Sequence, residues 1–224
     1  PQQFSPTEDF DSYPRTFEDD VAKFERAGGD VIWAPTRDEM YRPGFATHVQ
    51  PGGAAAGLET DFRPHFFRGV ATVCCKLFTQ TQPDIALFGE KDYQQLRVVS
   101  QMVRDLDLPL EIVGCPTVRE ADGLAMSSRN AYLSGAEHAT ATRLFDVISR
   151  VAADVGKGRA ADDSCSEAAD ALRSAGFGEI DYVVVRDSET LGEITQPLAR
   201  PARVLAAAWL GKTRLIDNLA CLPR

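Results

Sequence analysis

Histidine and cysteine are both scarce, and neither is placed as a metal site or a disulfide framework would require. The three histidines, His48, His65 and His138, lie far apart in sequence, which excludes a recognisable zinc motif. No C-x-x-C pair occurs, and the number of cysteines is odd. The cysteines are Cys74, Cys75, Cys115, Cys165 and Cys221. We therefore predict a reduced, cytoplasmic protein.

Positive charge is also in short supply. The 224-residue chain has 24 Lys and Arg against 33 Asp and Glu, so its formal net charge is −9. A broad nucleic-acid-binding surface would be basic, and we expect none here. No apolar run is long enough to span a bilayer, so we expect no membrane partner either. A small anionic ligand held by a few placed cations remains compatible with this composition.

The first half of the chain alternates between strand and helix patterns. Apolar residues recur at helical spacing from Phe66 to Phe78, and a second helix is predicted from about Lys91 to Leu106, with Leu106 on its core face. A capping-box pattern at 16–19 predicts a further helix start. Short apolar runs predict buried strands at 30–34, 85–88 and 111–113. This order is typical of a parallel sheet with crossover helices.

The pattern changes near Pro116. A polar segment at 118–130 contains an Asp122-Gly123 turn, and two helical stretches follow at about 135–155 and 163–175. Strand patterns then occur one after another, near 181–186, 203–209 and 213–219. We therefore predict a parallel α/β domain at 1–115 and a smaller C-terminal α+β domain at 116–224, with a hinge in the polar segment.

Lys91 carries the wrong charge for the first turn of a helix, where the helix dipole is positive. It follows Gly89 at the carboxyl end of a strand, which is where open parallel sheets bind ligands. An anion would meet both the lysine and the helix N–H groups there. Asp92 could accept ribose hydroxyls, and Gln95 shares a helix face with Lys91. The alternative is a solvated helix end with ordinary polar residues.

A second polar cluster occupies 125–130. Ser127, Ser128 and Arg129 offer two hydroxyls and a bidentate guanidinium, which can wrap phosphate oxygens. The alternative is a polar turn before a helix. Other polar or aromatic residues receive structural interpretations: we expect His138 on an exposed helix face and Trp209 in the core.

Five motifs resemble those of the pantothenate synthetase family. They are PQQF, DFDSYPRT, FGEKDYQQL, PTVREADGLAMSSRN and AAAWLGKTRLIDN, and the resemblance covers nearly the whole chain. It implies a Rossmann-like nucleotidyltransferase sheet at 1–115, a smaller α+β domain at 116–224 and a homodimer. It also implies that ATP and Mg²⁺ are used to join pantoate to β-alanine through a pantoyl adenylate, giving pantothenate, AMP and pyrophosphate.

The matching positions divide by the roles that the resemblance implies. Pantoate is assigned to Gln3 and Gln95. The adenosine part of ATP is assigned to Phe88, Gly89, Asp92 and Val118. The ATP phosphates and catalysis are assigned to Lys91, Ser127, Ser128 and Arg129. The phosphates themselves are expected to hold most of the Mg²⁺ coordination.

The resemblance fails at two places. The family's opening strand and its HxGH-type phosphate-binding loop have no counterpart in the 224 residues, so we expect an upstream segment to be missing and this chain alone to be inactive. In the segment RPHFFRG, His65 stands at a family glycine and Phe66 at a family histidine. Two alternatives therefore stay open: a relative that adenylates another small carboxylic acid, and a non-catalytic or incomplete adenine-nucleotide-binding fragment.

Overall fold

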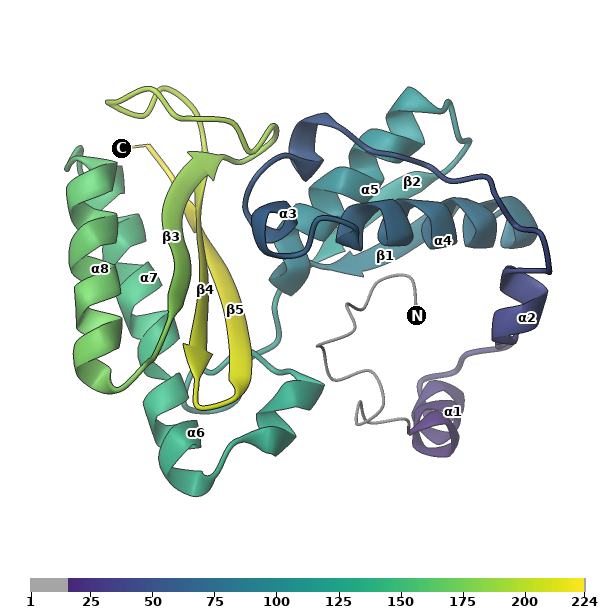
Figure 1. Ribbon diagram of the computed structural model, residues 1–224, viewed down its shortest axis with the longest axis horizontal. Coiled ribbons are helices and arrows are strands. Elements are labelled where there is room, and N and C mark those ends of the chain that lie inside the picture. The colour runs from purple at the N-terminus through teal and green to yellow at the C-terminus, as the bar shows by residue number, and fades with distance from the viewer. Residues whose placement is uncertain (1–15, 224) are drawn as a thin grey trace.

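The computed structural model describes residues 16–223, and its first half is built on a parallel pair of strands. Strands β1 (Ile85–Gly89) and β2 (Glu111–Cys115) pair in parallel along their whole length. Helix α5 (Tyr93–Asp105) makes the crossover between them, and α4 (Phe66–Thr81) packs against α5 (Figure 1). The predicted strand–helix–strand unit is therefore confirmed.

Only one face of this described sheet is covered. Ala86 and Phe88 pack against the apolar cluster of α4 and α5, whereas Ile85 and Leu87 alternate to the opposite face and are 54% and 68% exposed. The prediction of a buried strand at 85–88 is therefore wrong for Ile85 and Leu87, because both helices contribute to the same cluster on one side. Leu106 was also assigned wrongly to the core: α5 ends one residue before it, and it is half exposed.

Residues 30–34 do not form the predicted strand. Within the described part of the chain no strand lies beside them, and Val31 and Trp33 are largely exposed. Trp33 Nε1 instead donates to Gln80 Oε1 at 3.2 Å. An apolar run becomes a strand only where a second backbone takes up its N–H and C=O groups. The other short elements of this half are α1 (Phe17–Arg26), α2 (Arg37–Met40), η1 (Gly53–Ala55) and α3 (Glu59–Phe62).

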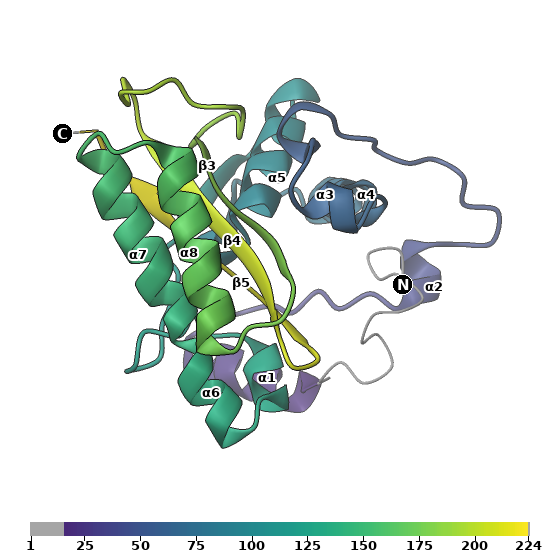
Figure 2. The same cartoon turned by 60° about the vertical axis from the view of Figure 1, so that its left-hand side comes forward.

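The second half is an antiparallel sheet whose strands follow the sequence order β3-β4-β5. Helices α7 and α8 lie side by side across one face of this sheet (Figure 2), and the other face turns toward α3, α4 and α5 (Figure 1). The predicted α+β arrangement is confirmed. The elements are α6 (Gly135–Ala141), α7 (Arg143–Gly156), α8 (Ala161–Ala175), β3 (Ile180–Asp187), β4 (Ala202–Leu210) and β5 (Thr213–Cys221).

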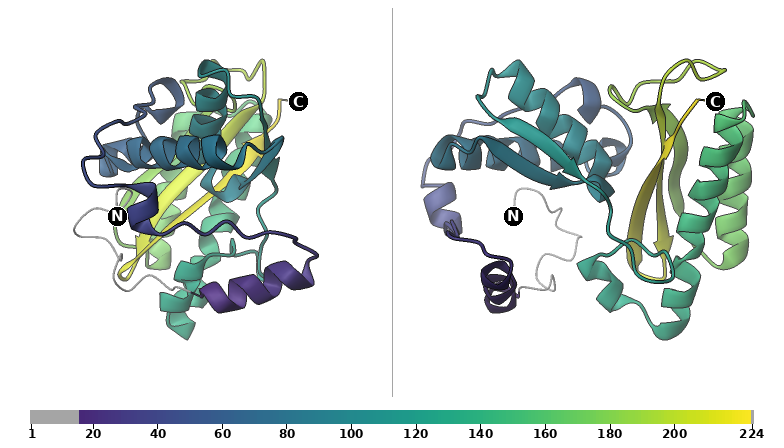
Figure 3. Two further views of the ribbon diagram at one scale, coloured as in Figure 1. Left: turned by 90° about the vertical axis from the view of Figure 1, so that its right-hand side faces the viewer. Right: turned by 180° about the vertical axis from the view of Figure 1, so that it is seen from behind.

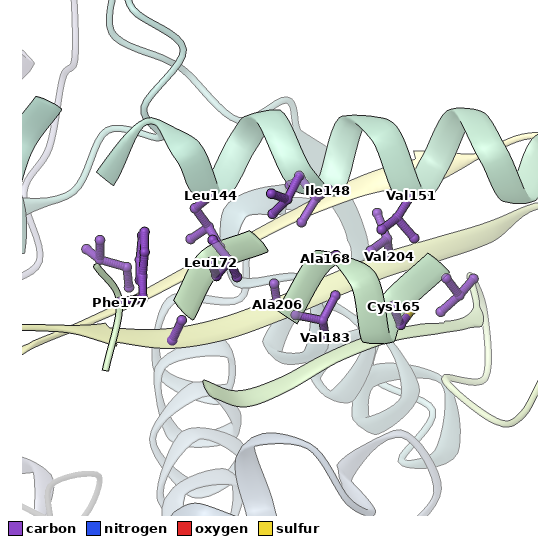
Figure 4. Close-up of a cluster of buried hydrophobic side chains, with 14 of the residues drawn as sticks. Leu144, Ile148, Val151, Cys165, Ala168, Leu172, Phe177, Val183, Val204 and Ala206 are labelled. Atoms are coloured by element: carbon purple, nitrogen blue, oxygen red, sulfur yellow. The ribbon is translucent and has the colours of Figure 1, made fainter. Parts of the chain in front are cut away.

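The alternation of side chains along β4 explains why its sheet is covered on both sides. Val204, Ala206 and Ala208 join the cluster under α7 and α8, which Figure 4 shows with Ile148 between the helix and the strands. Leu205 points the other way and belongs to the cluster of the first half. An apolar residue at almost every position of β4 is therefore typical of a strand buried on both faces.

The polar segment connects the two halves. Figure 3 shows the chain leaving β2 and passing the β4–β5 turn on its way to α6. The domain boundary at 115/116 and the hinge stay predictions. Among the helices of residues 16–223, none is both long and apolar enough to cross a membrane.

Candidate active site

A cleft of about 830 Å³ lies between the two halves of the molecule. Its walls come from α3 and α4, from the start of α5, from residues 124–132 and from the face of the β3–β5 sheet. Its cationic lining residues are Arg63, Lys91, Arg129, Lys212 and Arg214. Five acidic residues, Glu59, Asp92, Glu179, Asp181 and Asp217, also line the cleft, so its lining as a whole has no excess of positive charge. An anionic ligand would therefore be held by individually placed cations and not by a general positive potential.

The two polar clusters singled out from the sequence meet in this cleft. The predicted site residues that line it are Lys91, Asp92, Gln95, Ser127, Ser128 and Arg129. Lys91 and Arg129 come from different halves of the chain, and the structure brings both to one cavity. The roles of these residues stay predictions.

Phe88 and Gln3 stand apart from this group. The Phe88 ring packs against Phe78, with ring centroids 6.3 Å apart, and is not among the lining residues. The assignment of Phe88 to the adenosine stays a prediction. Gln3 lies outside the described residues.

Gly89 and Val118 are also outside the lining residues of the cleft, but they lie near the carboxyl ends of β1 and β2. Gly89 is opposite Cys115 in the parallel ladder, and Val118 follows three residues later, so both occur where the strands end. A Cβ added at Gly89 would meet nothing within 4 Å, and the Val118 side chain is 65% exposed. No described atom therefore blocks the approach to the Gly89 Cα atom, as the predicted contact with adenosine requires.

Lys91 lies in a separate turn, not in the first turn of α5 as predicted. This turn is η2 (Glu90–Asp92), a single 3-10 turn between β1 and α5. The Lys91 side chain is half-buried and Asp92 is exposed. Asn218 Nδ2 donates to the carbonyl oxygens of Glu90 and Lys91, at 2.9 and 2.8 Å. The cation is therefore carried by a turn whose backbone is held from β5.

Two adjacent glutamines at the start of α5 have different surroundings. Gln94 is buried: its Oε1 accepts from the Glu59 backbone N–H at 3.0 Å, and its Nε2 donates to Ala54 O at 3.0 Å. Gln94 thus fixes the wall of the cleft. Gln95, one residue later, is half-buried on the cleft side and keeps the amide that a hydroxy acid would use.

The segment that carries Ser127 and Arg129 is held by its own hydrogen bonds. Ser127 Oγ accepts from the Arg129 backbone N–H at 3.2 Å, at the start of η3 (Ser128–Tyr132). Asn130 Nδ2 donates to Glu120 Oε1 at 2.7 Å, and Glu120 Oε2 lies 2.9 Å from His138 Nε2. The expectation of an exposed His138 is therefore wrong, because this half-buried side chain supports the segment from α6.

One group of described side chains has the composition of a metal site. Ligand atoms of Glu120, Asp122 and His138 lie within 4.8 Å of one another. The two ring nitrogens of His138 face different carboxylates, at 2.9 Å from Glu120 and 3.6 Å from Asp122. The imidazole therefore lies between the two carboxylates, and the group acts as a structural support for this segment.

Three of the described carboxylates of the cleft already have a cationic partner. Glu59 and Asp181 pair with Arg214, and Asp217 pairs with Arg119, so these three are already engaged. Asp92 and Glu179 are the exposed carboxylates among the described lining residues. Mg²⁺ keeps several waters and is usually bound by one or two carboxylates together with substrate phosphates. The donor set fits a magnesium ion that arrives on ATP phosphates.

A buried ionic network on the cleft wall was missed from the sequence. Arg214 on β5 donates to both Glu59 carboxylate oxygens, at 2.8 and 2.9 Å, and its Nε donates to Asp181 at 2.6 Å. Tyr182 OH donates to Glu59 Oε1 at 2.7 Å. Trp209 was expected in the core but is half-buried, lines the cleft and donates from Nε1 to Asp181 at 3.1 Å. No local spacing marks partners that are so distant in sequence.

The pKa of Glu59 lies below its ordinary value. Burial acts to raise this pKa, but the charge and hydrogen bonds of Arg214, the hydroxyl of Tyr182 and the charge of Arg63 outweigh burial. Because the folded-state pKa is depressed, the carboxylate contributes stability above its ordinary pKa of about 4.3. That contribution is lost as the pH falls through the folded-state pKa.

We expect Glu59→Gln to be less stable than the wild type at neutral pH, with a difference that shrinks below about pH 4.3. Urea unfolding at a series of pH values measures the free energy of unfolding of both proteins. The matched control is Asp170→Asn in the exposed pair with Arg173, which should change the free energy of unfolding little. A Glu59→Gln difference that stays constant as the solution is acidified would contradict this account.

Comparison with known proteins shows the family of this chain. A family model described as pantoate-beta-alanine ligase matches residues 1–220. A pantothenate synthetase of Mesorhizobium japonicum is 57% identical over 219 residues, covering 98% of this chain and 77% of the relative. That of Caulobacter vibrioides is 52% identical over 222 residues, covering 98% of this chain and 78% of the relative.

Solved structures agree as well. A crystal structure of pantothenate synthetase from Thermus thermophilus has a TM-score of 0.93 and 45% identity, covering 100% of this chain and 81% of that chain. A pantoate-beta-alanine ligase from Francisella tularensis, solved with beta-gamma ATP and beta-alanine, has a TM-score of 0.79 and 29% identity, covering 98% of this chain and 75% of that chain. The family model, the identity to these relatives and the shared fold show that this chain belongs to the pantoate-beta-alanine ligase family.

Proposed function

We propose that this protein condenses pantoate with β-alanine, using ATP and Mg²⁺, and releases pantothenate, AMP and pyrophosphate. The observation that carries the proposal is the meeting of Lys91, Gln95 and Arg129 in one cleft. The Francisella tularensis relative, whose structure contains an ATP derivative and beta-alanine, supports the choice of substrates. A cytoplasmic homodimer is part of the same proposal.

In the first step the pantoate carboxylate attacks the α-phosphorus of ATP. An oxygen–phosphorus bond forms, the bond to the β-phosphate breaks, and pyrophosphate leaves. Holding the two reactants in line can supply roughly 7–11 kcal/mol of the barrier. In the proposal Gln95, together with Gln3, orients pantoate for this attack.

The cations act where negative charge develops. In the proposal Lys91, from the first half of the chain, and Arg129, from the second, bind phosphate oxygens, and Ser127 and Ser128 add hydroxyl donors. Preorganised donors of this kind are more effective inside a cleft than in water, because they need no rearrangement during reaction. Mg²⁺ supplies further charge neutralisation when bound to the phosphates. Phe88, Gly89, Asp92 and Val118 hold the adenosine.

In the second step the β-alanine amine attacks the carbonyl carbon of the pantoyl adenylate. The new carbon–nitrogen bond forms, the amine loses a proton, and AMP leaves. A mixed anhydride is prone to hydrolysis, so the cleft has to exclude water. The segment 123–130 is the proposed cover, since it carries the phosphate-binding residues next to the cleft.

Pantoate-dependent exchange of labelled pyrophosphate into ATP tests this proposal. We expect the intact gene product to catalyse exchange with pantoate and, once β-alanine is added, to release AMP. Exchange with another small carboxylic acid in place of pantoate would favour a different ligase. Nucleotide binding without exchange on any carboxylate would favour the non-catalytic alternative.

A further inference from the structure

Asn218 on β5 forms hydrogen bonds to the turn that carries Lys91. Its Nδ2 donates to the carbonyl oxygens of Glu90 and Lys91, so it fixes both peptide units that flank the Lys91 Cα atom. Its Oδ1 accepts from Arg203 Nε at 2.7 Å, which settles the orientation of the amide. Asn218 is buried, so these hydrogen bonds are shielded from water.

Arg203 also contacts residues at this turn. Its Nη2 donates to Glu90 Oε2 at 3.0 Å, and its guanidinium carbon lies 4.0 Å from the centre of the Tyr93 ring. The turn between β1 and α5 is therefore held by β4 and β5 on its backbone, on Glu90 and on the first residue of α5.

Asp217, the preceding residue, holds the other cation-bearing segment. Consecutive strand residues point to opposite faces, and Asp217 turns toward Arg119, which donates to its two oxygens at 2.6 and 2.9 Å. Arg119 forms an antiparallel bridge with Ala125, two residues before Ser127. Arg119 also lies over the Phe145 ring at 3.9 Å. The segment leading to Arg129 is thus fixed from the same point of β5.

We propose that Asp217 and Asn218 are positioning residues that set the separation of Lys91 and Arg129. One dipeptide of β5 holds both cation-bearing segments, so a change at either residue would move one cation relative to the other. Neither residue has to touch the reacting atoms. This inference rests on the proposed function, because the spacing matters only if both cations meet one polyphosphate.

A double-mutant cycle tests the inference in the intact protein. We expect Asn218→Ala to lower pantoate-dependent exchange by about 10²-fold, as a misplaced catalytic group does. In a Lys91→Met background the same substitution should cost less than about threefold, because its effect acts through Lys91. Equal losses in both backgrounds would indicate a general structural role and overturn the proposal. Asp217→Asn with Arg129→Met forms the second cycle, with the same expectation.

Controls separate folding from positioning. Ser164→Ala removes a buried hydrogen bond of α8, from Ser164 Oγ to Ala160 O at 3.0 Å, and should lower the melting temperature while leaving exchange near the wild-type rate. If Asn218→Ala does not fold, Arg203→Lys, which keeps a charge near Glu90 but loses the planar fork, takes its place in the cycle.

The dissociation constant of a non-hydrolysable ATP analogue gives a second readout of the same cycle. If the wild type bound the analogue but showed no pantoate-dependent exchange, the proposed function would fall, and non-additive losses of affinity would still support positioning. Additive losses of affinity would overturn the positioning proposal. A wild-type protein that binds no ATP analogue would overturn both proposals.

Discussion

Replacing Lys91 by alanine is expected to lower pantoate-dependent exchange by about 10²–10³-fold, the usual effect of removing one preorganised donor to developing charge. The protein should stay folded, because Asn218 holds the turn through backbone carbonyls that alanine retains. Exchange assays and thermal unfolding measure the two effects separately. Lys91→Met, which keeps most of the side-chain length but not the charge, should lose as much activity as alanine.

The matched control is Lys157→Ala, at an exposed lysine just after α7 and outside the cleft. We expect it to exchange at the wild-type rate. Near-normal exchange in Lys91→Ala, or an equal loss in the control, would remove Lys91 from the proposed mechanism.

Replacing Arg214 by alanine is expected to lower the free energy of unfolding by about 3–5 kcal/mol. The Arg214 side chain is 15% exposed, and those of its partners Glu59 and Asp181 are 8% and 2% exposed. The substitution leaves the buried Asp181 carboxylate without its cation and leaves Glu59 with only the more distant Arg63, at 3.7 Å. Removing one member of a buried ion pair is costly for this reason, even where the intact pair adds little net stability.

Urea unfolding at neutral pH measures this change. The control is Arg173→Ala, which breaks an exposed pair with Asp170 and should cost under about 1 kcal/mol. If Arg214→Ala were no more destabilising than the control, the ionic network of Arg214 would not contribute to the stability of the cleft wall.

The placement of Lys91 at a ligand site could be predicted from general rules, whereas its meeting with Arg129 was expected only from the family resemblance. Ligands bind beyond the carboxyl ends of parallel strands, and Lys91 follows such an end in a position that the helix dipole disfavours. The helices α4 and α5 and the three late strands were also predictable, since their apolar residues recur with the period of the element they form.

The failures share a physical cause, which is that the missing information lies in tertiary neighbours. The run at 30–34 has the composition of a strand, but it can form one only if another strand lies beside it and takes up its backbone hydrogen bonds. Trp209 is aromatic and lies in an apolar run, yet its place in the cleft wall depends on Asp181 across the sheet. His138 is half-buried because a segment with Glu120 folds back over α6. None of these partners is adjacent in sequence.

A crystal structure with a non-hydrolysable ATP analogue tests the central claim most directly, namely that cations from two distant segments meet one polyphosphate. The account predicts Lys91 Nζ and the Arg129 guanidinium within hydrogen-bonding distance of phosphate oxygens of the same nucleotide, with the adenosine near Gly89 and Val118. A nucleotide bound elsewhere, or one whose phosphates contact neither side chain, would contradict it.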